Sequence, residues 1–353
     1  MVSAARDTRL IVASETVAVA FAVLALVSAC AGQLQRHAVK PARREVPTQP
    51  VVGALGRIAA VGTSGSYRVG ERQVTFFEPA HIGPTGLDLG RRTLVTQIRY
   101  PLAQRSAGPQ PALGPFPLLM FAPGFMQCGS PYSRLLHAWA SAGYVVAVVN
   151  FPRTDCHVGA AAYEPDLVNQ PADMSYVLSR LLVLSAQPHD LFSGLLNRHE
   201  IAAAGQSDGG DTVAALAANA CCTDHRLEAV TVLSGAKWPP MPGRYFPHGA
   251  PPMLFVQGSA DTINPPWTSL QLYRADGANS RYYLDLFGAN HIIPYVGSNP
   301  VERLVARVTL AFFDRYVLGQ AGALAIATAP THWLPLAGSV RVAVLPPVAT
   351  SQR

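Results

Sequence analysis

Charged residues are scarce in this chain of 353 residues, making up only 14% of it. Although the formal net charge is +6, there is no long run of Lys and Arg with interleaved aromatic residues, which argues against nucleic-acid binding. The basic excess better suits attraction to an anionic membrane or envelope surface. No internal repeat or coiled-coil heptad is visible, so repeat architectures are not expected. The 49% hydrophobic content is ample for a sizeable core, and we do not expect the whole chain to be disordered.

Long apolar runs without charge are also rare, and one of them lies near the N-terminus. The run Thr16–Ala29 follows a basic start formed by Arg6 and Arg9. It is too short to span a bilayer comfortably as a helix. Its end, V-S-A-C at residues 27–30, resembles the lipobox of bacterial lipoprotein signals, in which the cysteine is lipidated and becomes the mature N-terminus. We therefore expect residues 1–30 to be a lipoprotein-type signal peptide with Cys30 as the lipidation site.

Two alternatives stay open for this segment: an uncleaved anchor, or an ordinary signal cut near Ala31. With a cleaved signal the protein is exported, either as a cell-envelope lipoprotein whose lipid anchor at Cys30 contacts the membrane or as a secreted protein. Residues 31–50 contain basic residues and prolines but show neither helical nor strand periodicity. We expect them to form a flexible basic tether.

Apart from Cys30, the sequence contains four cysteines, Cys128, Cys156, Cys221 and Cys222. An even number in a chain that carries an export signal permits disulfides. The sequence alone leaves three pairings open, and buried free thiols are a further alternative.

Beyond residue 50, strand-like and helix-like segments alternate. Two early segments alternate with period 2 and suit antiparallel strands at a sheet edge: Gln73–Glu78 and Thr93–Tyr100. Nearly continuous apolar runs, typical of strands covered on both faces, follow at Leu118–Ala122, Tyr144–Val149, Ile201–Ala204, Ala229–Leu233 and Met253–Val256. Helical patterns cover Tyr132–Ala142, Ala172–Leu184, Gly209–Ala220, Thr268–Ala275 and Val301–Val317. The alternation predicts an α/β fold with a mainly parallel sheet and helices on both faces.

The strongest motif is G-x-S-x-G at Gly205–Gly209, which contains Ser207. It lies between a predicted strand and a predicted helix, the context in which this motif forms a nucleophile elbow. Small residues are needed there because bulk at Gly205 or Gly209 would collide with neighbouring elements. We therefore predict that Ser207 is a catalytic nucleophile.

A serine nucleophile needs a general base that is itself held by a carboxylate. His291 follows the predicted strand Tyr282–Phe287, and Asp261 follows the strand before it, so both should lie at carboxyl ends of strands, where ligands bind in such sheets. We predict a triad of Ser207, Asp261 and His291. Asp285 is the rival acid, but it lies inside its predicted strand.

Attack by the serine would create an oxyanion, which needs two backbone donors. We predict the amide of Asp208, just after the nucleophile, and that of Phe125, in the loop after strand Leu118–Phe121. The alternative for the second donor is that Pro123-Gly124 forms merely a turn.

These motifs resemble the α/β-hydrolase branch that contains bacterial relatives of platelet-activating-factor acetylhydrolase, the chlorophyllases and the cutinase-like polyester hydrolases. The resemblance covers roughly residues 70–317 and is carried by FPLLMFAPGF, SAGYVVAVVNFP, NQPADMSYVLSRLL, AAGQSDGG and VQGSAD with GANH. It implies a mixed eight-stranded sheet, no metal, no organic cofactor and ester hydrolysis through an acyl-enzyme. Two positions depart from the family: Gln206 replaces a frequent His, a variation expected to change little, and Asp208 replaces the Met of polyester hydrolases, which puts a polymer substrate in doubt.

The resemblance also implies roles for two aromatic residues and one cysteine pair. Phe125 and Trp238 would flank the acyl group of the substrate, as aromatic residues at similar places do in the polyester-cleaving branch, although plain packing is an equal alternative. The strands before Cys128 and Cys156 are neighbours in the resembled fold, so we expect a disulfide between these two residues.

From these features we expect an exported serine carboxylic-ester hydrolase acting on a small-molecule or lipid-like ester. The catalytic domain should cover residues 51–320, followed by a C-terminal extension at residues 321–353. The alternatives are a serine peptidase on the same fold and a catalytically inactive envelope binding protein.

Overall fold

The structure is a computed structural model that describes residues 65–104, 108, 110–278, 280–328 and 341–345. The predicted signal peptide, the predicted tether and the lipidation site Cys30 lie outside the described residues. Among the helices that are described, none is long and apolar enough to cross a membrane.

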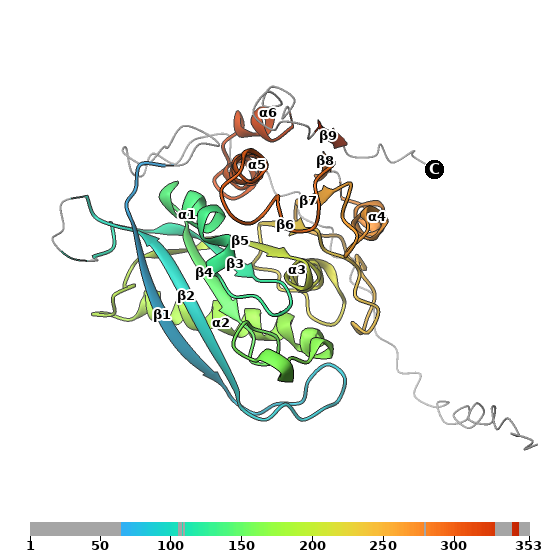
Figure 1. Ribbon diagram of the computed structural model, residues 1–353. Coiled ribbons are helices and arrows are strands. Elements are labelled where there is room, and N and C mark those ends of the chain that lie inside the picture. The colour runs from blue at the N-terminus through green and yellow to red at the C-terminus, as the bar shows by residue number, and fades with distance from the viewer. Residues whose placement is uncertain (1–64, 105–107, 109, 279, 329–340, 346–353) are drawn as a thin grey trace, which may run out of the picture. The chain divides into compact units, whose positions relative to one another are not determined.

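A mixed sheet of nine strands in the order β1-β2-β4-β3-β5-β6-β7-β8-β9 forms the centre of the fold (Figure 1). The strands are β1 (Val69–Glu78), β2 (Arg92–Pro101), β3 (Phe116–Ala122), β4 (Val145–Asn150), β5 (Leu196–Gln206), β6 (Ala229–Leu233), β7 (Met253–Gly258), β8 (Arg281–Phe287) and β9 (Arg341–Leu345). The six strands from β3 to β8 are parallel to one another. β1, β2 and β9 are antiparallel to their neighbours. The strand–helix alternation predicted from the sequence is therefore confirmed, with one strand more than the eight that the resemblance implies.

The additional strand, β9, comes from the segment that the sequence sets apart as a C-terminal extension. It pairs with β8, with Tyr283 opposite Leu345 and Phe287 opposite Arg341. Part of the segment after residue 320 thus continues the central sheet.

Apolar residues on the central strands point alternately to two separate cores. On β3, Leu118 and Met120 belong to one core, and Leu119 and Phe121 belong to the other. All seven residues of β3 are buried, which explains why the central strands are continuous apolar runs.

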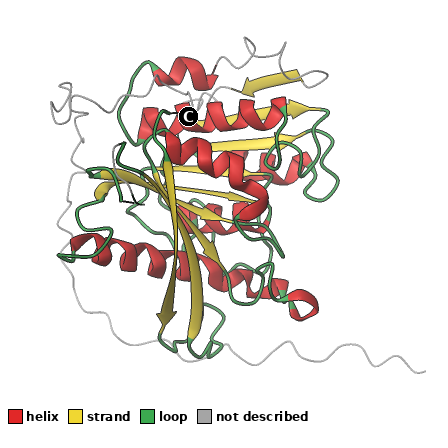
Figure 2. Ribbon diagram, turned by 60° about the vertical axis from the view of Figure 1, so that its left-hand side comes forward, coloured by secondary structure: helices red, strands yellow, loops and turns green. Residues whose placement is uncertain are grey.

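Helices cover both faces of the sheet, as Figure 2 shows. Their bounds are α1 (Ser133–Ser141), α2 (Gln170–Ala186), α3 (Asp208–Ala218), α4 (Pro266–Ala275), α5 (Pro300–Tyr316) and α6 (Ala323–Thr328). Buried residues of α2, α3 and α4 share the core of Leu118, whereas those of α1, α5 and α6 share the core of Leu119. The prediction of helices on both faces is confirmed.

The long connection between β4 and α2 contains two short 3-10 helices, of which the longer covers Glu164–Asn169. Two buried ion pairs fix it and the start of α2 to the sheet: the guanidinium of Arg92, at the start of β2, donates to Asp166 of the 3-10 helix at 2.7 Å and to Asp173 of α2 at 2.6 Å. This anchor holds the connection at the carboxyl edge of the parallel strands.

Candidate active site

Ser207 lies at the sharp turn between β5 and α3, where the predicted elbow is found. Its backbone has φ of +57°, a left-handed conformation that is strained for a residue other than glycine. The turn is held by two backbone hydrogen bonds, from the Ser207 amide to the carbonyl of Leu233 and from the Asp211 amide to the carbonyl of Ser207. A strained turn fixed in this way presents its side chain at the carboxyl end of β5.

The glycines of the motif are required by close approaches of the backbone. A Cβ at Gly205 would collide with the backbone of Gly209, and a Cβ at Gly209 would collide with the carbonyl of Ala122 at the end of β3. The predicted reason for small residues at both positions is therefore confirmed.

The loops after β7 and β8 bring Asp261 and His291 together. Nδ1 of His291 lies 2.7 Å from Oδ2 of Asp261, and both side chains are almost fully buried. This bond leaves Nε2 as the ring nitrogen that is free of the carboxylate, which is the arrangement that an oriented general base requires.

Both oxygens of Asp261 are occupied by donors. Gln257 donates to Oδ2 at 2.9 Å, and the amides of Ile263 and Asn264 donate to Oδ1 at 3.0 and 2.9 Å. Burial alone would raise the pKa of Asp261, but the bonds from His291 and from the Asn264 amide outweigh it and lower the pKa below its ordinary value. Asp261 is therefore kept ionised beside the imidazole.

The rival acid, Asp285, lies inside β8, as the sequence predicted. Among the described residues its buried Oδ1 has no hydrogen-bond partner, and burial raises the pKa of this carboxyl. The hydrogen bond to His291 comes from Asp261 and not from Asp285.

Gln206, at a position where the sequence predicts a variation of little effect, contacts the candidate base. Its side-chain Nε2 lies 3.2 Å from Nε2 of His291 and donates to the carbonyl of His291 at 3.1 Å. Its Oε1 accepts a hydrogen bond of 2.8 Å from Tyr132, whose hydroxyl accepts one of 3.2 Å from the Gly124 amide. No hydrogen bond joins Ser207 to His291 in the described residues, so the Gln206 amide faces the imidazole nitrogen in this state.

The two amides predicted to bind an oxyanion, those of Phe125 and Asp208, lie next in the chain to Gly124 and Ser207. Gly124 and Met126 donate their amides to Tyr132 and to the carbonyl of Thr154. In the described part of the chain, no protein acceptor binds the amide of Phe125 between them. Asp208 begins α3, so its amide is among the donors at a helix N-terminus that lack an acceptor within the helix.

The side chain of Asp208 is buried next to the predicted nucleophile, and its Oδ2 has no hydrogen-bond partner within the described part of the chain. Burial is the main cause that raises its pKa to about 7, and the nearby Glu164 contributes in the same direction. The residue's own amide donates toward the carboxyl and lowers the pKa by a smaller amount. The charge of this carboxyl therefore changes near neutral pH.

The described residues contain two disulfides. Cys128 and Cys156 are joined, as predicted, and this bond ties the loop after β3 to the loop after β4. The second disulfide joins the adjacent residues Cys221 and Cys222. The alternative of free thiols at these four positions is thus not found.

The two aromatic residues expected beside the substrate are placed differently. Phe125 is half-buried in the loop after β3. Trp238 follows β6 and packs against one core, and its buried Nε1 has no hydrogen-bond partner in the residues that the structure describes. The packing of Trp238 against the core is the alternative weighed from the sequence.

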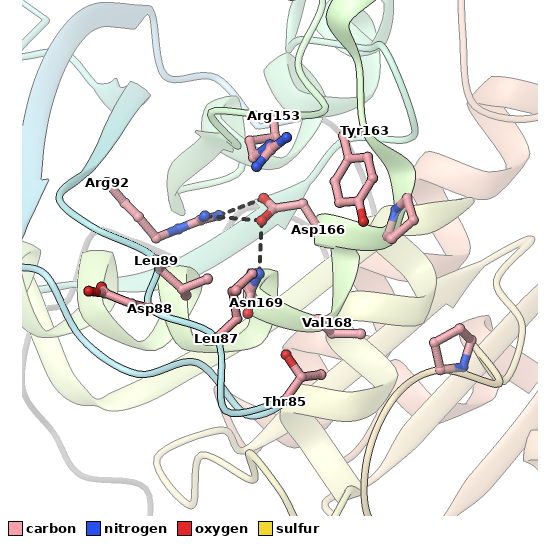
Figure 3. Close-up of a pocket in the computed structure, with 12 residues that line it drawn as sticks. Thr85, Leu87, Asp88, Leu89, Arg92, Arg153, Tyr163, Asp166, Val168 and Asn169 are labelled. Atoms are coloured by element: carbon pink, nitrogen blue, oxygen red, sulfur yellow. Dashed lines mark hydrogen bonds and ion pairs between the residues drawn. The ribbon is translucent and has the colours of Figure 1, made fainter. Parts of the chain in front are cut away.

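A cavity of roughly 250 Å³ lies at the same edge of the sheet, between the β1–β2 loop and the 3-10 helix Glu164–Asn169. Figure 3 shows the Arg92–Asp166 ion pair on its wall, with Arg153 and Tyr163 beside it. No residue of the predicted triad lines this cavity. Arg92 and Asp166 on its wall are paired with each other, whereas Arg153 and Asp88, which also line it, are exposed.

One group of side chains in the described residues has the spacing of metal ligands: Cys128, Cys156 and His157. Because the two cysteines form a disulfide, their sulfurs are bonded to each other and are not available as thiolate ligands.

Comparison with known proteins gives no further identification: no protein-family model matches the chain, and no curated protein matches it significantly.

Proposed function

We propose that the chain is a serine carboxylic-ester hydrolase of the α/β-hydrolase fold, related to the branch named above. The observation that carries the proposal is the Asp261–His291 hydrogen bond of 2.7 Å at the ends of β7 and β8, together with a strained Ser207 at the end of β5. The chain order of serine, acid and histidine, each at a strand end, is that of the fold's catalytic triad.

In this mechanism Ser207 Oγ gives its proton to Nε2 of His291 and attacks the ester carbonyl. The carbonyl oxygen gains the negative charge and is bound by the amides of Phe125 and Asp208. His291 then donates the proton to the departing alcohol as the C–O bond breaks, leaving an acyl-enzyme. Water, deprotonated by His291, releases the acid in the same way.

The contact between the Gln206 amide and Nε2 of His291 must open before His291 can take the proton of Ser207. Because an imidazole nitrogen has a single in-plane lone pair, Nε2 of His291 must turn from the Gln206 amide to the Ser207 hydroxyl when catalysis begins. Catalytic hydrogen bonds often tighten only when substrate is bound.

The test is hydrolysis of p-nitrophenyl esters from acetyl to palmitoyl, with Ser207→Ala as the control, and labelling of Ser207 by a fluorophosphonate. Labelled wild type and an inactive Ser207→Ala protein are expected. A folded wild-type protein that neither reacts with the probe nor cleaves any ester would refute the proposal and favour a binding protein. Cleavage of peptide amides and not of esters would favour the peptidase alternative.

Export, lipidation at Cys30 and membrane attachment remain proposals of their own. The wild type should stay with membranes until detergent releases it, whereas the Cys30→Ser protein should not be anchored and should need no detergent. Their failure would leave the catalytic proposal untouched.

A further inference from the structure

Large apolar side chains that are exposed to solvent gather at one edge of the described structure. They are Phe77, Ile82, Leu87, Met126, Tyr163, Ile263, Trp267, Phe287, Ile292 and Ile293, and the exceptions located elsewhere are Leu113 and Val183. Most of these residues lie in the connections that follow β3, β4, β7 and β8, whose carboxyl ends share one edge because the strands are parallel. The β1–β2 connection reaches the same edge, since the start of β2 pairs with the end of β4.

Four of these side chains form what we call the catalytic-edge patch: Ile263, Trp267, Ile292 and Ile293. Ile263 is 64% and Trp267 is 59% exposed, although both are large and apolar. Soluble domains rarely leave several such side chains exposed together without a binding role.

The two segments that carry the patch present no charged side chain to solvent. Residues 259–272 contain one ionisable carboxylate, Asp261, and residues 288–301 contain one basic group, His291. Both are buried and paired with each other. The third ionisable side chain of these two segments, the phenol of Tyr295, is fully buried. An apolar phase can therefore meet these segments without removing a charge from water.

Hydrogen bonds attach the patch to the catalytic residues. The Ile263 amide donates to Asp261 Oδ1, and the amides of Ile292 and Ile293 donate to the side chain of Asn290, which precedes His291. The two segments also bond to each other, from the Ala260 amide to the carbonyl of Ala289. Whatever covers the patch therefore lies against the loops that hold the acid and the base.

We propose that the catalytic-edge patch adsorbs to the surface of a lipid aggregate with zwitterionic headgroups, and that the ester is drawn from that surface. The second half rests on the proposed function, whereas adsorption does not require hydrolysis.

The location of the patch favours a lipid surface over a protein. A partner protein or a second copy of the chain seated there would cover the loops of Asp261 and His291, but a lipid surface brings esters to them. Outside the patch, the same edge exposes charges of both signs: Arg91 over the ring of Phe77, Arg153 over the ring of Tyr163, and the carboxylate of Asp88. Mixed charges beside aromatic rings match the phosphate and ammonium groups of a zwitterionic headgroup.

Binding is measured by flotation with phosphatidylcholine vesicles. All proteins carry Ser207→Ala, so that no lipid is consumed, and Cys30→Ser, so that no acyl chain is attached. Two double variants of the patch are compared with the parent. One carries Ile263→Ser and Trp267→Ser, and the other carries Ile292→Ser and Ile293→Ser. The matched control is a double variant with Leu113→Ser and Val183→Ser. These exposed apolar residues lie in the β2–β3 connection and in the last turn of α2, near the opposite ends of the parallel strands. Thermal unfolding shows whether each variant is folded.

Each patch variant is expected to weaken vesicle binding at least tenfold, because two exposed apolar side chains no longer leave water on adsorption. The control pair should bind like the parent, and high salt should not release the protein. Brominated phosphatidylcholine should quench tryptophan emission, and Trp267→Phe should remove that quenching while retaining adsorption.

Three results would overturn the inference: no binding of the parent to the vesicles, equal binding of patch and control variants, or a parent that self-associates and becomes monomeric only in the patch variants. Because binding is read in a protein that lacks Ser207, these outcomes are independent of ester hydrolysis by the wild type. An inactive wild type whose parent still binds vesicles through the patch would refute the proposed function alone.

Discussion

The side-chain amide of Gln206 lies against His291 at two points, 3.2 Å from the imidazole Nε2 and 3.1 Å from the carbonyl oxygen. The Tyr132 hydroxyl donates a hydrogen bond to Oε1 of Gln206 and accepts one from the Gly124 amide, so one network connects the loop after β3, the end of β5 and the loop after β8. In the mechanism proposed above, Gln206 is therefore a positioning residue, which would act on the reaction through His291 and the loop of Gly124.

The first prediction is that Gln206→Leu lowers both stability and kcat. The change leaves the buried Tyr132 hydroxyl without an acceptor, which should lower the free energy of unfolding by about 1–3 kcal/mol. Loss of the bond to the His291 carbonyl frees the base loop, and we expect kcat to fall about tenfold, equivalent to 1.4 kcal/mol. Urea unfolding and the kcat for p-nitrophenyl butyrate measure the two effects.

Thr309→Val is the matched control for this prediction. It leaves the buried Nε1 of Trp139 without its acceptor at 3.0 Å, on the face of the sheet covered by α1 and α5. A similar loss of stability with an unchanged kcat is expected. If both variants lose kcat equally, Gln206 supports the fold only and does not position His291.

The second prediction separates the two acids near the ends of β7 and β8. Asp261→Asn removes the carboxylate that orients His291, and kcat should fall by about 10³- to 10⁴-fold with little change in KM. Asp285→Asn should leave kcat close to that of the wild type, and it should not destabilise the protein above neutral pH, because burial already disfavours the charged form of Asp285. Steady-state kinetics on one soluble ester decide this, and a larger defect in Asp285→Asn would reverse the assignment of the acid.

Much of the fold and the candidate triad could be predicted because each signal is local. Residues buried on both faces must be apolar, so the runs that become β3 to β7 are visible in the sequence. The sequence alone predicts that Asp261 and His291 lie close together, because each follows a parallel strand and the carboxyl ends of parallel strands lie at one edge of the sheet.

Other features were missed because they depend on partners that are far apart in the chain. Gln206 and Tyr132 are 74 positions apart, and nothing in either local sequence indicates their bond. Arg92 is separated from Asp166 and Asp173 by 74 and 81 positions. β9 was missed because an edge strand is specified by its neighbour, here β8, more than by its own short sequence.

The third prediction concerns the disulfide between Cys128 and Cys156. It closes a loop with a sequence separation of 28, so replacing both residues by Ser should lower the free energy of unfolding by roughly 3–4 kcal/mol through loop entropy. Since the bond ties the loop of Phe125 to the loop after β4, kcat should also fall. Denaturant unfolding and ester hydrolysis measure these changes.

The other disulfide supplies the control, because Cys221 and Cys222 are adjacent and their bond closes almost no chain. Replacing that pair by Ser should change both stability and kcat much less. Equal losses in the two double variants would show that neither loop closure nor the oxyanion loop explains the role of the Cys128–Cys156 bond.

The fourth prediction is an alkaline loss of activity caused by Asp208. Burial and Glu164 raise the pKa of this carboxyl to about 7, above its ordinary value of 3.8. Its contribution to stability is therefore fully present below about pH 4 and is lost as the pH rises through about 7. Above that pH a carboxylate also stands beside the amide predicted to bind the oxyanion, so kcat should decline as Asp208 ionises.

Asp208→Asn removes this titration. At pH 8.5 the variant should be more stable than the wild type by roughly 1–3 kcal/mol, the usual cost of a buried polar group without a partner, and its kcat should not decline. Near pH 4 the two proteins should be equally stable, because both side chains are neutral. Unfolding curves and pH–kcat profiles of variant and wild type test these differences, with Asp88→Asn, at an exposed carboxylate, as the control.

Glu164→Gln should act in the opposite sense: without the neighbouring charge the pKa of Asp208 falls, and the decline in kcat begins at a lower pH than in the wild type. If Asp208→Asn and the wild type decline at the same pH, another group controls the alkaline limb.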